Sequence, residues 1–184
     1  MRVLAGALKG QRLVTPKGRT TRPTADQVRI ACLDTLMPYL ESGPFLDLFA
    51  GAGGVGIEAL SRGAPSAVFV ERDRQATIAL DDNLTRLGLV ERARVLRQDV
   101  GRALGLLERE GRTFAVAFLD PPYDSLDGAS ALAAVARGDC LLPGAIVVAQ
   151  HATKAPLPAT PGCLAHWKDR RFGETTLTFF RRGA

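Results

Sequence analysis

The segment Asp120-Pro121-Pro122-Tyr123 contains groups that could hold a planar amino group. It follows an apolar run at residues 114–119, so we expect Asp120 where a buried strand ends, at the sheet edge where open α/β folds bind ligands. Two successive prolines fix φ and donate no N–H, which leaves their carbonyl oxygens as acceptors. An exocyclic base amine has two N–H donors, so the Asp120 carboxylate and the Pro121 carbonyl could orient it while Tyr123 stacks on the ring. The alternative interpretation is a strand end closed by a Pro-Pro turn.

A glycine-rich run lies upstream of this segment. Residues 45–49 predict a buried strand, and residues 51–56 follow with the sequence Gly-Ala-Gly-Gly-Val-Gly. This run matches the dinucleotide pattern G-x-G-x-x-G, with the acidic Glu71 about 20 residues further on. The glycines provide a tight turn and a bare backbone at a helix start, where a pyrophosphate or a carboxylate could bind. Asp47 favours an amino-acid ligand, because its carboxylate attracts an ammonium group and repels a pyrophosphate. A glycine-rich turn without a ligand is the remaining alternative.

Acidic residues end, or nearly end, four successive predicted strands. Glu71 is placed to accept hydrogen bonds from two ribose hydroxyls. Asp99, with the backbone N–H of Val100, could bind the amine and a ring nitrogen of adenine, or Asp99 could only cap the next helix. This recurrence predicts that all four share one ligand cleft. The four residues are Asp47, Glu71, Asp99 and Asp120.

Strand and helix patterns alternate from residue 45 to residue 151, which predicts a parallel sheet with helices on both faces. Two short runs near the C-terminus predict a closing antiparallel pair, which gives seven strands rather than the six of a dinucleotide fold. We expect strands at residues 45–49, 67–71, 93–97, 114–119, 144–150, 164–170 and 175–181, and helices at residues 55–62, 74–87, 102–109 and 126–136.

Positive charge is concentrated near the N-terminus. The chain of 184 residues has a net charge of +5, but residues 1–29 hold seven Lys or Arg and one acidic residue, a net charge of +6. A basic arm on a nearly neutral body is typical of nucleic-acid-binding proteins, because phosphate contacts dominate their affinity. A solvated basic tail is the alternative. The candidate RNA contacts are Arg2, Lys9, Arg12, Arg19 and Arg22.

The N-terminal residues also show structural patterns. Residues 2–6 and 12–16 alternate like two short strands and predict a hairpin. A helix is expected after residues 22–24, ending near Pro38, with one apolar face made by Val28, Cys32, Leu33 and Leu36. We divide the chain into a basic extension at residues 1–23 and a catalytic domain at residues 24–184.

Some classes of protein are not expected. No apolar run approaches the about 20 residues of a membrane span, and the N-terminus lacks a signal-like apolar stretch, so we expect a soluble cytoplasmic protein. The three cysteines stand at unrelated spacings, and the two histidines do not group with them. We therefore expect neither a disulfide nor a metal site.

Asp-Pro-Pro-Tyr after a strand, with Asp-x-Phe-x-Gly-x-Gly upstream, resembles the motif pair of S-adenosylmethionine-dependent amino methyltransferases. The resemblance implies that Asp120, the Pro121 carbonyl and Tyr123 hold the target nitrogen. It also implies that S-adenosylmethionine is the cofactor and binds along the strand ends. The candidate cofactor-binding residues are Asp47, Phe49, Ala50, Gly51, Gly53, Glu71, Arg72, Asp99 and Val100.

Further segments narrow the resemblance to the bacterial RsmD family, which methylates N2 of a guanine in 16S ribosomal RNA. The segments are Arg-Val-Leu-Ala-Gly at 2–6, Lys-Gly at 9–10, Arg-Pro-Thr-Ala-Asp-Gln-Val-Arg at 22–29, Gly-Ile-Glu-Ala-Leu-Ser-Arg-Gly-Ala at 56–64 and Phe-Gly-Glu-Thr at 172–175. The resemblance implies a Rossmann-like, mostly parallel seven-stranded methyltransferase sheet with an antiparallel C-terminal hairpin and an N-terminal β-hairpin extension. It also implies a monomer that acts by direct methyl transfer on ribosomal RNA, either free or within a small-subunit particle.

Three other functions remain open from the sequence. An adenine-N6 DNA or RNA methyltransferase is the first, because adenine presents an amine to the same acceptors. An NAD-dependent oxidoreductase would use the glycine run for a pyrophosphate. A non-catalytic RNA-binding module would use only the basic arm.

Overall fold

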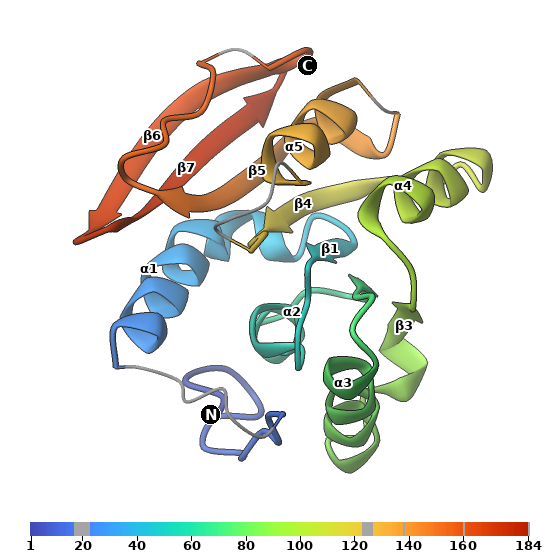
Figure 1. The fold of residues 1–184 in the computed structure, drawn as a ribbon. Coiled ribbons are helices and arrows are strands. Elements are labelled where there is room, and N and C mark those ends of the chain that lie inside the picture. Colours follow the sequence, from blue (N-terminus) through green and yellow to red (C-terminus); the bar gives the residue numbers. More distant parts are fainter. Residues whose placement is uncertain (17–22, 123–126, 138, 160, 184) are drawn as a thin grey trace.

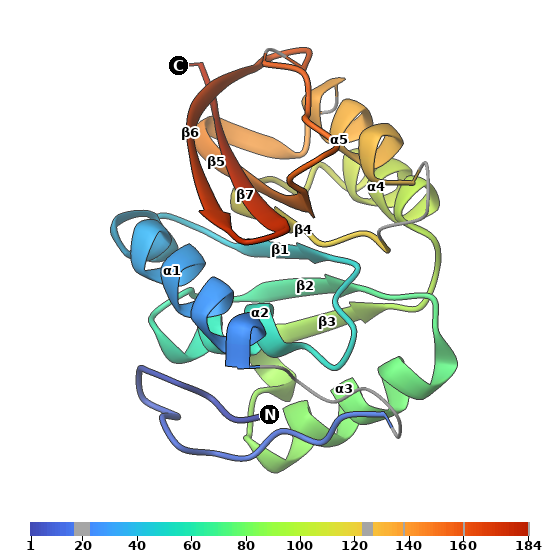
Figure 2. The ribbon, with the colours of Figure 1, turned by 60° about the vertical axis from the view of Figure 1, so that its left-hand side comes forward.

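A seven-stranded sheet lies between two layers of helices in the computed structural model (Figures 1 and 2). The structure describes residues 1–184 except residues 17–22, 123–126, 138, 160 and 184. The helices are α1 (Pro23–Leu40), α2 (Gly54–Ser61), α3 (Arg74–Arg86), α4 (Val100–Arg109) and α5 (Asp127–Arg137), with a short 3-10 turn, η1 (Val90–Arg92). The strands are β1 (Phe45–Leu48), β2 (Ala67–Val70), β3 (Ala93–Leu96), β4 (Phe114–Leu119), β5 (Leu141–Ala152), β6 (Leu164–Phe172) and β7 (Thr175–Arg182).

The strands follow the order β3-β2-β1-β4-β5-β7-β6. The first five are parallel, and β7 pairs antiparallel with both β5 and β6. The predicted mostly parallel sheet with an antiparallel C-terminal pair is confirmed. Leu48, at the end of β1, is level with Val70 of β2 and Leu119 of β4. The residues that follow these strands therefore emerge together at one edge of the sheet.

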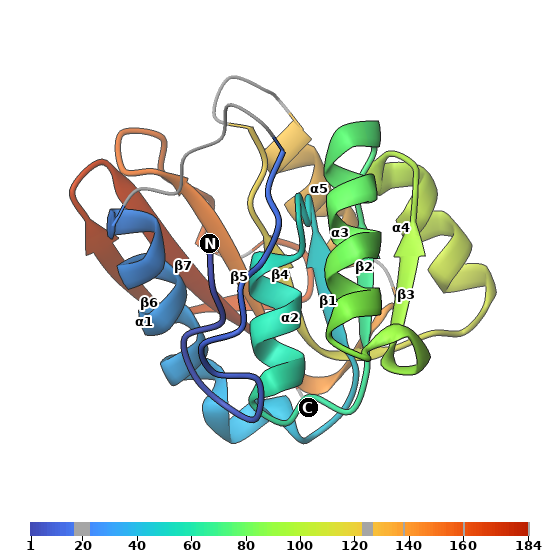
Figure 3. The ribbon, with the colours of Figure 1, turned by 90° about the horizontal axis from the view of Figure 1, so that it is seen from below.

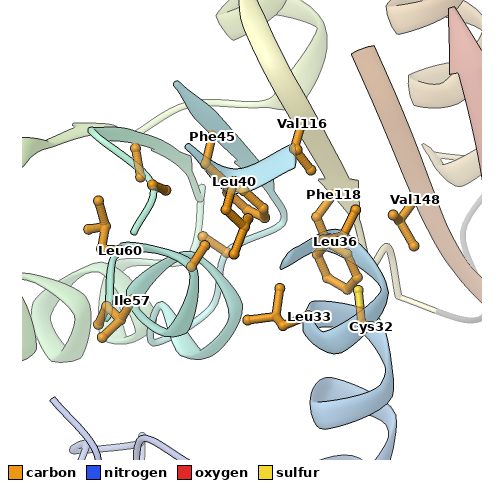
Figure 4. Close-up of a cluster of buried hydrophobic side chains, with 14 of the residues drawn as sticks. Cys32, Leu33, Leu36, Leu40, Phe45, Ile57, Leu60, Val116, Phe118 and Val148 are labelled. Atoms are coloured by element: carbon orange, nitrogen blue, oxygen red, sulfur yellow. The ribbon is translucent and has the colours of Figure 1, made fainter. Parts of the chain in front are cut away.

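Two hydrophobic layers cover the sheet, because alternate residues of a strand point to opposite faces. Helices α1, α2 and α3 pack on one face, where Phe45, Phe69 and Phe118 are fully or almost fully buried (Figure 4). Helices α4 and α5 pack on the other face, against residues such as Leu46 and Phe180. The predicted arrangement of helices on both faces is confirmed.

Helix α1 buries the four apolar residues predicted for its inner face and ends near Pro38 as predicted. Its last residue is Leu40, so Pro38 lies inside the last turn. A proline in the last turn removes one backbone donor, whereas Leu36 and Leu40 at 0% and 1% exposure hold that turn against the core. Strand β5 begins earlier than predicted, at Leu141, with a register shift on its partner strand β4. In the part of the chain that the structure describes, every helix is too short or too polar to cross a membrane.

Residues 1–16, the N-terminal segment, lie against α2 and α3 (Figure 3). The predicted hairpin is present as a single antiparallel bridge, between Arg2 and Arg12, rather than as two strands. The reason is that backbone N–H groups of the segment bind side chains elsewhere. The N–H groups of Leu4 and Ala5 donate to the two oxygens of Glu58, each at 2.8 Å.

Apolar side chains of the N-terminal segment join the core of the sheet domain. Val3 and Leu13 are 1% and 5% exposed and belong to the same cluster as α1 and α2. Val14 donates its N–H to Asn83 of α3 at 2.7 Å. These contacts attach the segment to the domain along its length, and the division of the chain at residue 23 stays a prediction.

Candidate active site

A cavity of about 1590 Å³ opens at the carboxyl edge of the parallel strands. The four carboxylates predicted to share a cleft all line it. Helix α1, the N-terminal segment and the β6–β7 turn supply its other walls. Of the predicted site residues, the lining contains Asp47, Phe49, Ala50, Gly51, Glu71, Arg72, Asp99, Val100, Asp120 and Pro121. Tyr123 lies outside the described residues, and Gly53 caps α2 without lining the cavity.

The turn between β1 and α2 has an unusual backbone. Gly51 and Gly53 have φ of 57° and 86°, a left-handed conformation that glycine adopts without steric cost. A Cβ on Gly53 would also lie 2.5 Å from a methyl carbon of Leu80. Phe49 has φ of 65°, which is strained for a bulky residue, and such strain is concentrated at functional sites. The turn thus presents bare backbone and the start of α2 to the cavity.

Asp47 is buried, at 2% exposure, and its carboxylate accepts the N–H of Gly56 at 2.8 Å. Burial is the main cause that raises the pKa of Asp47 to about 7; the Gly56 hydrogen bond opposes this shift, and the nearby Asp120 and Glu71 carboxylates add to it. A Cβ on Gly56 would lie 2.3 Å from the ring of Phe69. Glycine at position 56 therefore lets α2 approach β2 closely enough to reach Asp47.

Glu71 connects the end of β2 to the glycine turn. One of its oxygens accepts the N–H of Gly51 at 2.8 Å, and the other accepts the N–H of Asp73 at 2.8 Å. Each carboxylate oxygen has a second lone pair, so Glu71 can still accept hydrogen bonds from a ligand in the cavity.

Asp99 caps helix α4. Its carboxylate accepts the N–H of Arg102 at 3.0 Å and lies 3.3 Å from the Nε atom of the same residue. The capping alternative considered from the sequence is therefore present. Because Asp99 and Val100 also line the cavity, capping leaves a role in ligand binding open.

Arg29 is a cavity residue that the sequence pattern did not single out. Arg29 is one of the seven basic residues among residues 1–29, yet it is only 7% exposed and lines the cavity. Its Nη2 atom donates to the carbonyl of Arg2 at 2.8 Å and to Asp26 at 3.0 Å. Its Nη1 atom would lie 3.2 Å from a Cβ on Gly54, at the start of α2. A cation is thus held beside the glycine turn.

The buried Nε atom of Arg29 has no hydrogen-bond partner among the described residues. The Nε atom forms an ion pair with a carboxylate oxygen of Glu58, but the two atoms are 3.9 Å apart, too far for a hydrogen bond. The only sequence signal for this residue was its place at the end of the Arg-Pro-Thr motif, which gave no indication of burial.

Three of the predicted RNA contacts are described by the structure, and these three lie apart from the cavity lining. Arg2, Lys9 and Arg12 are exposed on the N-terminal segment. Arg19 and Arg22 lie outside the described residues. The structure therefore places the described basic side chains on the surface of a segment whose first residue, Met1, borders the cavity.

Comparison with known proteins gives consistent results. The family described as "Conserved hypothetical protein 95" matches residues 1–181. The Bacillus subtilis protein YlbH is 37% identical over 182 residues, covering 99% of each chain. The "Ribosomal RNA small subunit methyltransferase D" of Haemophilus influenzae is 33% identical over 160 residues, covering 85% of this chain and 81% of the relative. The solved structure of the Escherichia coli protein yhhF has a TM-score of 0.87 at 27% identity, covering 100% of this chain and 98% of that one. The family model matches nearly the whole chain, and the Haemophilus influenzae relative is a ribosomal RNA small subunit methyltransferase D, abbreviated RsmD. The chain therefore belongs to the RsmD family.

Proposed function

We propose that this protein transfers a methyl group from S-adenosylmethionine to the exocyclic N2 amine of a guanine in 16S ribosomal RNA. The observation that carries the proposal is the meeting of four carboxylates, the glycine turn and Asp120-Pro121 in one cavity. The names of the relatives from Haemophilus influenzae and Escherichia coli support a substrate in the small-subunit ribosomal RNA.

The residues around the cavity fit S-adenosylmethionine. Glu71 would accept hydrogen bonds from its ribose, and Asp99 with the Val100 N–H would bind its adenine. Asp47 would face its ammonium group. The Arg29 guanidinium beside the start of α2 would hold its carboxylate, because both a cation and a helix N-terminus attract anions. When bound, the cofactor supplies an electrophilic methyl group.

The same donor set is poorly suited to NAD. A pyrophosphate at the glycine turn would lie near the Glu71 carboxylate, which repels it, and would disfavour the ionised form of Asp47, whereas an ammonium group would favour that form. The adenosine half is common to both cofactors, so the discrimination lies at Asp47 and Arg29. This charge pattern favours an amino-acid moiety, which has one group of each sign.

Asp120 and Pro121 would orient the target amine. A carboxylate and a carbonyl oxygen accept the two N–H bonds of the amine, which directs its nitrogen lone pair away from both acceptors. Asp120 need not be a strong base, because the nitrogen can attack before it loses a proton. Tyr123 would stack on the guanine ring. Positioning by these residues is sufficient for direct transfer without a covalent intermediate.

The exposed cations of the N-terminal segment would contact RNA phosphates, together with Arg19 and Arg22. We propose that the protein acts as a monomer on free ribosomal RNA or on a small-subunit particle.

The test is a methylation assay followed by nucleoside mass spectrometry. Unmodified 16S ribosomal RNA is incubated with the protein and S-adenosylmethionine, and N2-methylguanosine is the expected product. N6-methyladenosine would instead identify an adenine methyltransferase. Calorimetric titration should detect S-adenosylmethionine and not NAD, and the opposite result would overturn the cofactor assignment.

A further inference from the structure

A second basic region lies at the C-terminal end of the chain. Residues 153–184 contain six Lys or Arg and two acidic residues, a net charge of +4, whereas residues 30–152 contain eleven and sixteen, a net charge of −5. The chain after residue 29 therefore consists of an acidic part and a basic C-terminal part, and the β6–β7 hairpin, residues 164–182, holds five of the six C-terminal cations. This hairpin is formed by β6 and β7, and β6 is the edge strand of the sheet (Figure 1).

Several of these cations share one face of the hairpin. Lys168 is paired with Phe179 and Arg170 with Leu177, and both β7 partners are buried on the face covered by α1. Directly opposed residues of antiparallel strands point to the same face, so Lys168 and Arg170 lie on the α1 side. Arg181 is two residues beyond Phe179 and joins them.

An aromatic cluster supports this face. Trp167 sits at a register shift between His166 and Lys168, and its ring contacts Tyr39 of α1 at a centroid distance of 5.9 Å. The Lys168 Nζ atom lies 4.1 Å from the centre of the Trp167 ring, and the Arg181 guanidinium lies 5.0 Å from it. Packing against the ring orders two long cationic side chains in advance of any ligand. We call Trp167, Lys168, Arg170 and Arg181 the β6 cationic face.

The charge of the β6 cationic face is not neutralised by its neighbours. In the described part of the chain, Lys168, Arg170 and Arg181 form no ion pair. Partial burial and the adjacent Arg170 lower the pKa of Lys168. Asp169 points to the opposite face of the hairpin, where Thr178 donates to it at 2.8 Å and a ring nitrogen of His166 lies at 3.0 Å. The cations are therefore available to an external anion.

The β6 cationic face leads to the active-site cavity. Phe172 follows Arg170 on the same side of β6 and lines the cavity with the β6–β7 turn. Arg170 is also close enough to the cavity residue Cys32 to lower its thiol pKa, against the larger opposing effect of burial. Helix α1 separates this hairpin from the N-terminal segment (Figures 1 and 2). Cations therefore lie on both sides of α1.

We propose that the β6 cationic face binds the phosphate backbone of the substrate RNA beside the nucleotide held at Asp120. This proposal rests on the proposed function in taking RNA as the substrate. The spacing supports a track along one strand, because Lys168 and Arg170 are about 6.6 Å apart along β6 at a rise of about 3.3 Å per residue. The ring of Trp167, already in contact with two cations, offers an apolar surface against a sugar or base.

The test compares two double variants that remove the same charge. Lys168→Ala with Arg170→Ala neutralises the β6 cationic face. Arg171→Ala with Arg137→Ala removes two exposed cations from the opposite side of the sheet. Each lost phosphate contact lowers the slope of log affinity against log salt by roughly 0.7 to 0.9. The first variant should therefore flatten the slope by about 1.4 to 1.8 and weaken binding to unmodified 16S RNA about 10- to 30-fold at 0.15 M salt. The control pair should change neither.

Trp167 provides an independent measurement, because it is the only tryptophan in the chain. Adding the RNA to the wild-type protein should change Trp167 fluorescence, and S-adenosylmethionine affinity should be equal in all variants. Unchanged RNA affinity and salt slope in a folded Lys168→Ala, Arg170→Ala variant would overturn the proposal, as would RNA binding that leaves Trp167 fluorescence unaltered. Methylation that persists in such a variant would leave the proposed function intact. RNA binding without methylation of any guanine would instead refute the proposed methyltransferase function, while the β6 cationic face would still be an RNA-binding surface.

Discussion

From the raised pKa of Asp47 we predict how the free energy of unfolding of the protein depends on pH. Asp47 is buried and accepts one backbone hydrogen bond, from Gly56. An asparagine introduced by Asp47→Asn could still accept this bond through its amide oxygen. The variant therefore removes the titration and keeps the main contact. Burial is the larger influence on the pKa, and the Asp120 and Glu71 carboxylates act in the same direction.

The sign follows from proton linkage. The folded-state pKa is about 7, and an unfolded aspartate has a pKa of about 3.9, so the native state binds the proton more tightly. The stabilisation from protonated Asp47 is complete below pH of about 4 and is lost as the pH rises through about 7. A shift of about 3 units corresponds to about 4 kcal/mol. Asp47→Asn should thus gain stability relative to wild type by up to about 4 kcal/mol between pH 4 and pH 7.5.

The assay is urea denaturation of both proteins at several pH values, with unfolding monitored by Trp167 fluorescence. Glu91→Gln, at an exposed carboxylate of η1, is the control for a charge change at the surface. Other carboxylates titrate in both proteins and largely cancel from the difference. A stability difference between Asp47→Asn and wild type that stays constant from pH 4 to pH 8 would refute the reasoning.

Other consequences concern the ligands. Glu71→Ala should weaken S-adenosylmethionine binding by about 1 to 3 kcal/mol in calorimetry. Glu71→Gln keeps one acceptor and should lose less, whereas unaltered affinity in both variants would remove Glu71 from the site. Asp120→Ala should slow single-turnover methyl transfer by on the order of 10²-fold and leave cofactor affinity unchanged. Near wild-type rates would show that Asp-Pro-Pro-Tyr is only a structural turn. Neutralising Arg2, Lys9 and Arg12 together should flatten the salt slope of RNA binding by about two to three units with S-adenosylmethionine affinity unchanged. An unchanged slope would leave these three residues as a solvated surface.

The sequence by itself was sufficient to predict the sheet and the meeting of its four carboxylates. Parallel strands in one sheet end at the same edge, so the chain position of Glu71 or Asp120 relative to its strand already fixes where its backbone lies. The glycine run was equally informative, because the backbone at Gly51 and Gly53 adopts positive φ. These features depend on residues close in sequence, where period and backbone sterics decide the outcome.

Tertiary packing determined which basic residues are buried and which are exposed, and the number of charges in the sequence does not reveal this. Arg29 was one of seven basic residues near the N-terminus, and only contacts with Arg2, Asp26 and Glu58 place it in the cavity wall. The N-terminal pairing is limited to one bridge because other N–H groups of the segment, such as those of Leu4 and Val14, donate to side chains up to 69 positions away. Likewise, Lys168 and Arg170 share a face with Trp167 because of a register shift against β7. Exposure and strand face arise from such distant contacts, and local patterns therefore leave them undetermined.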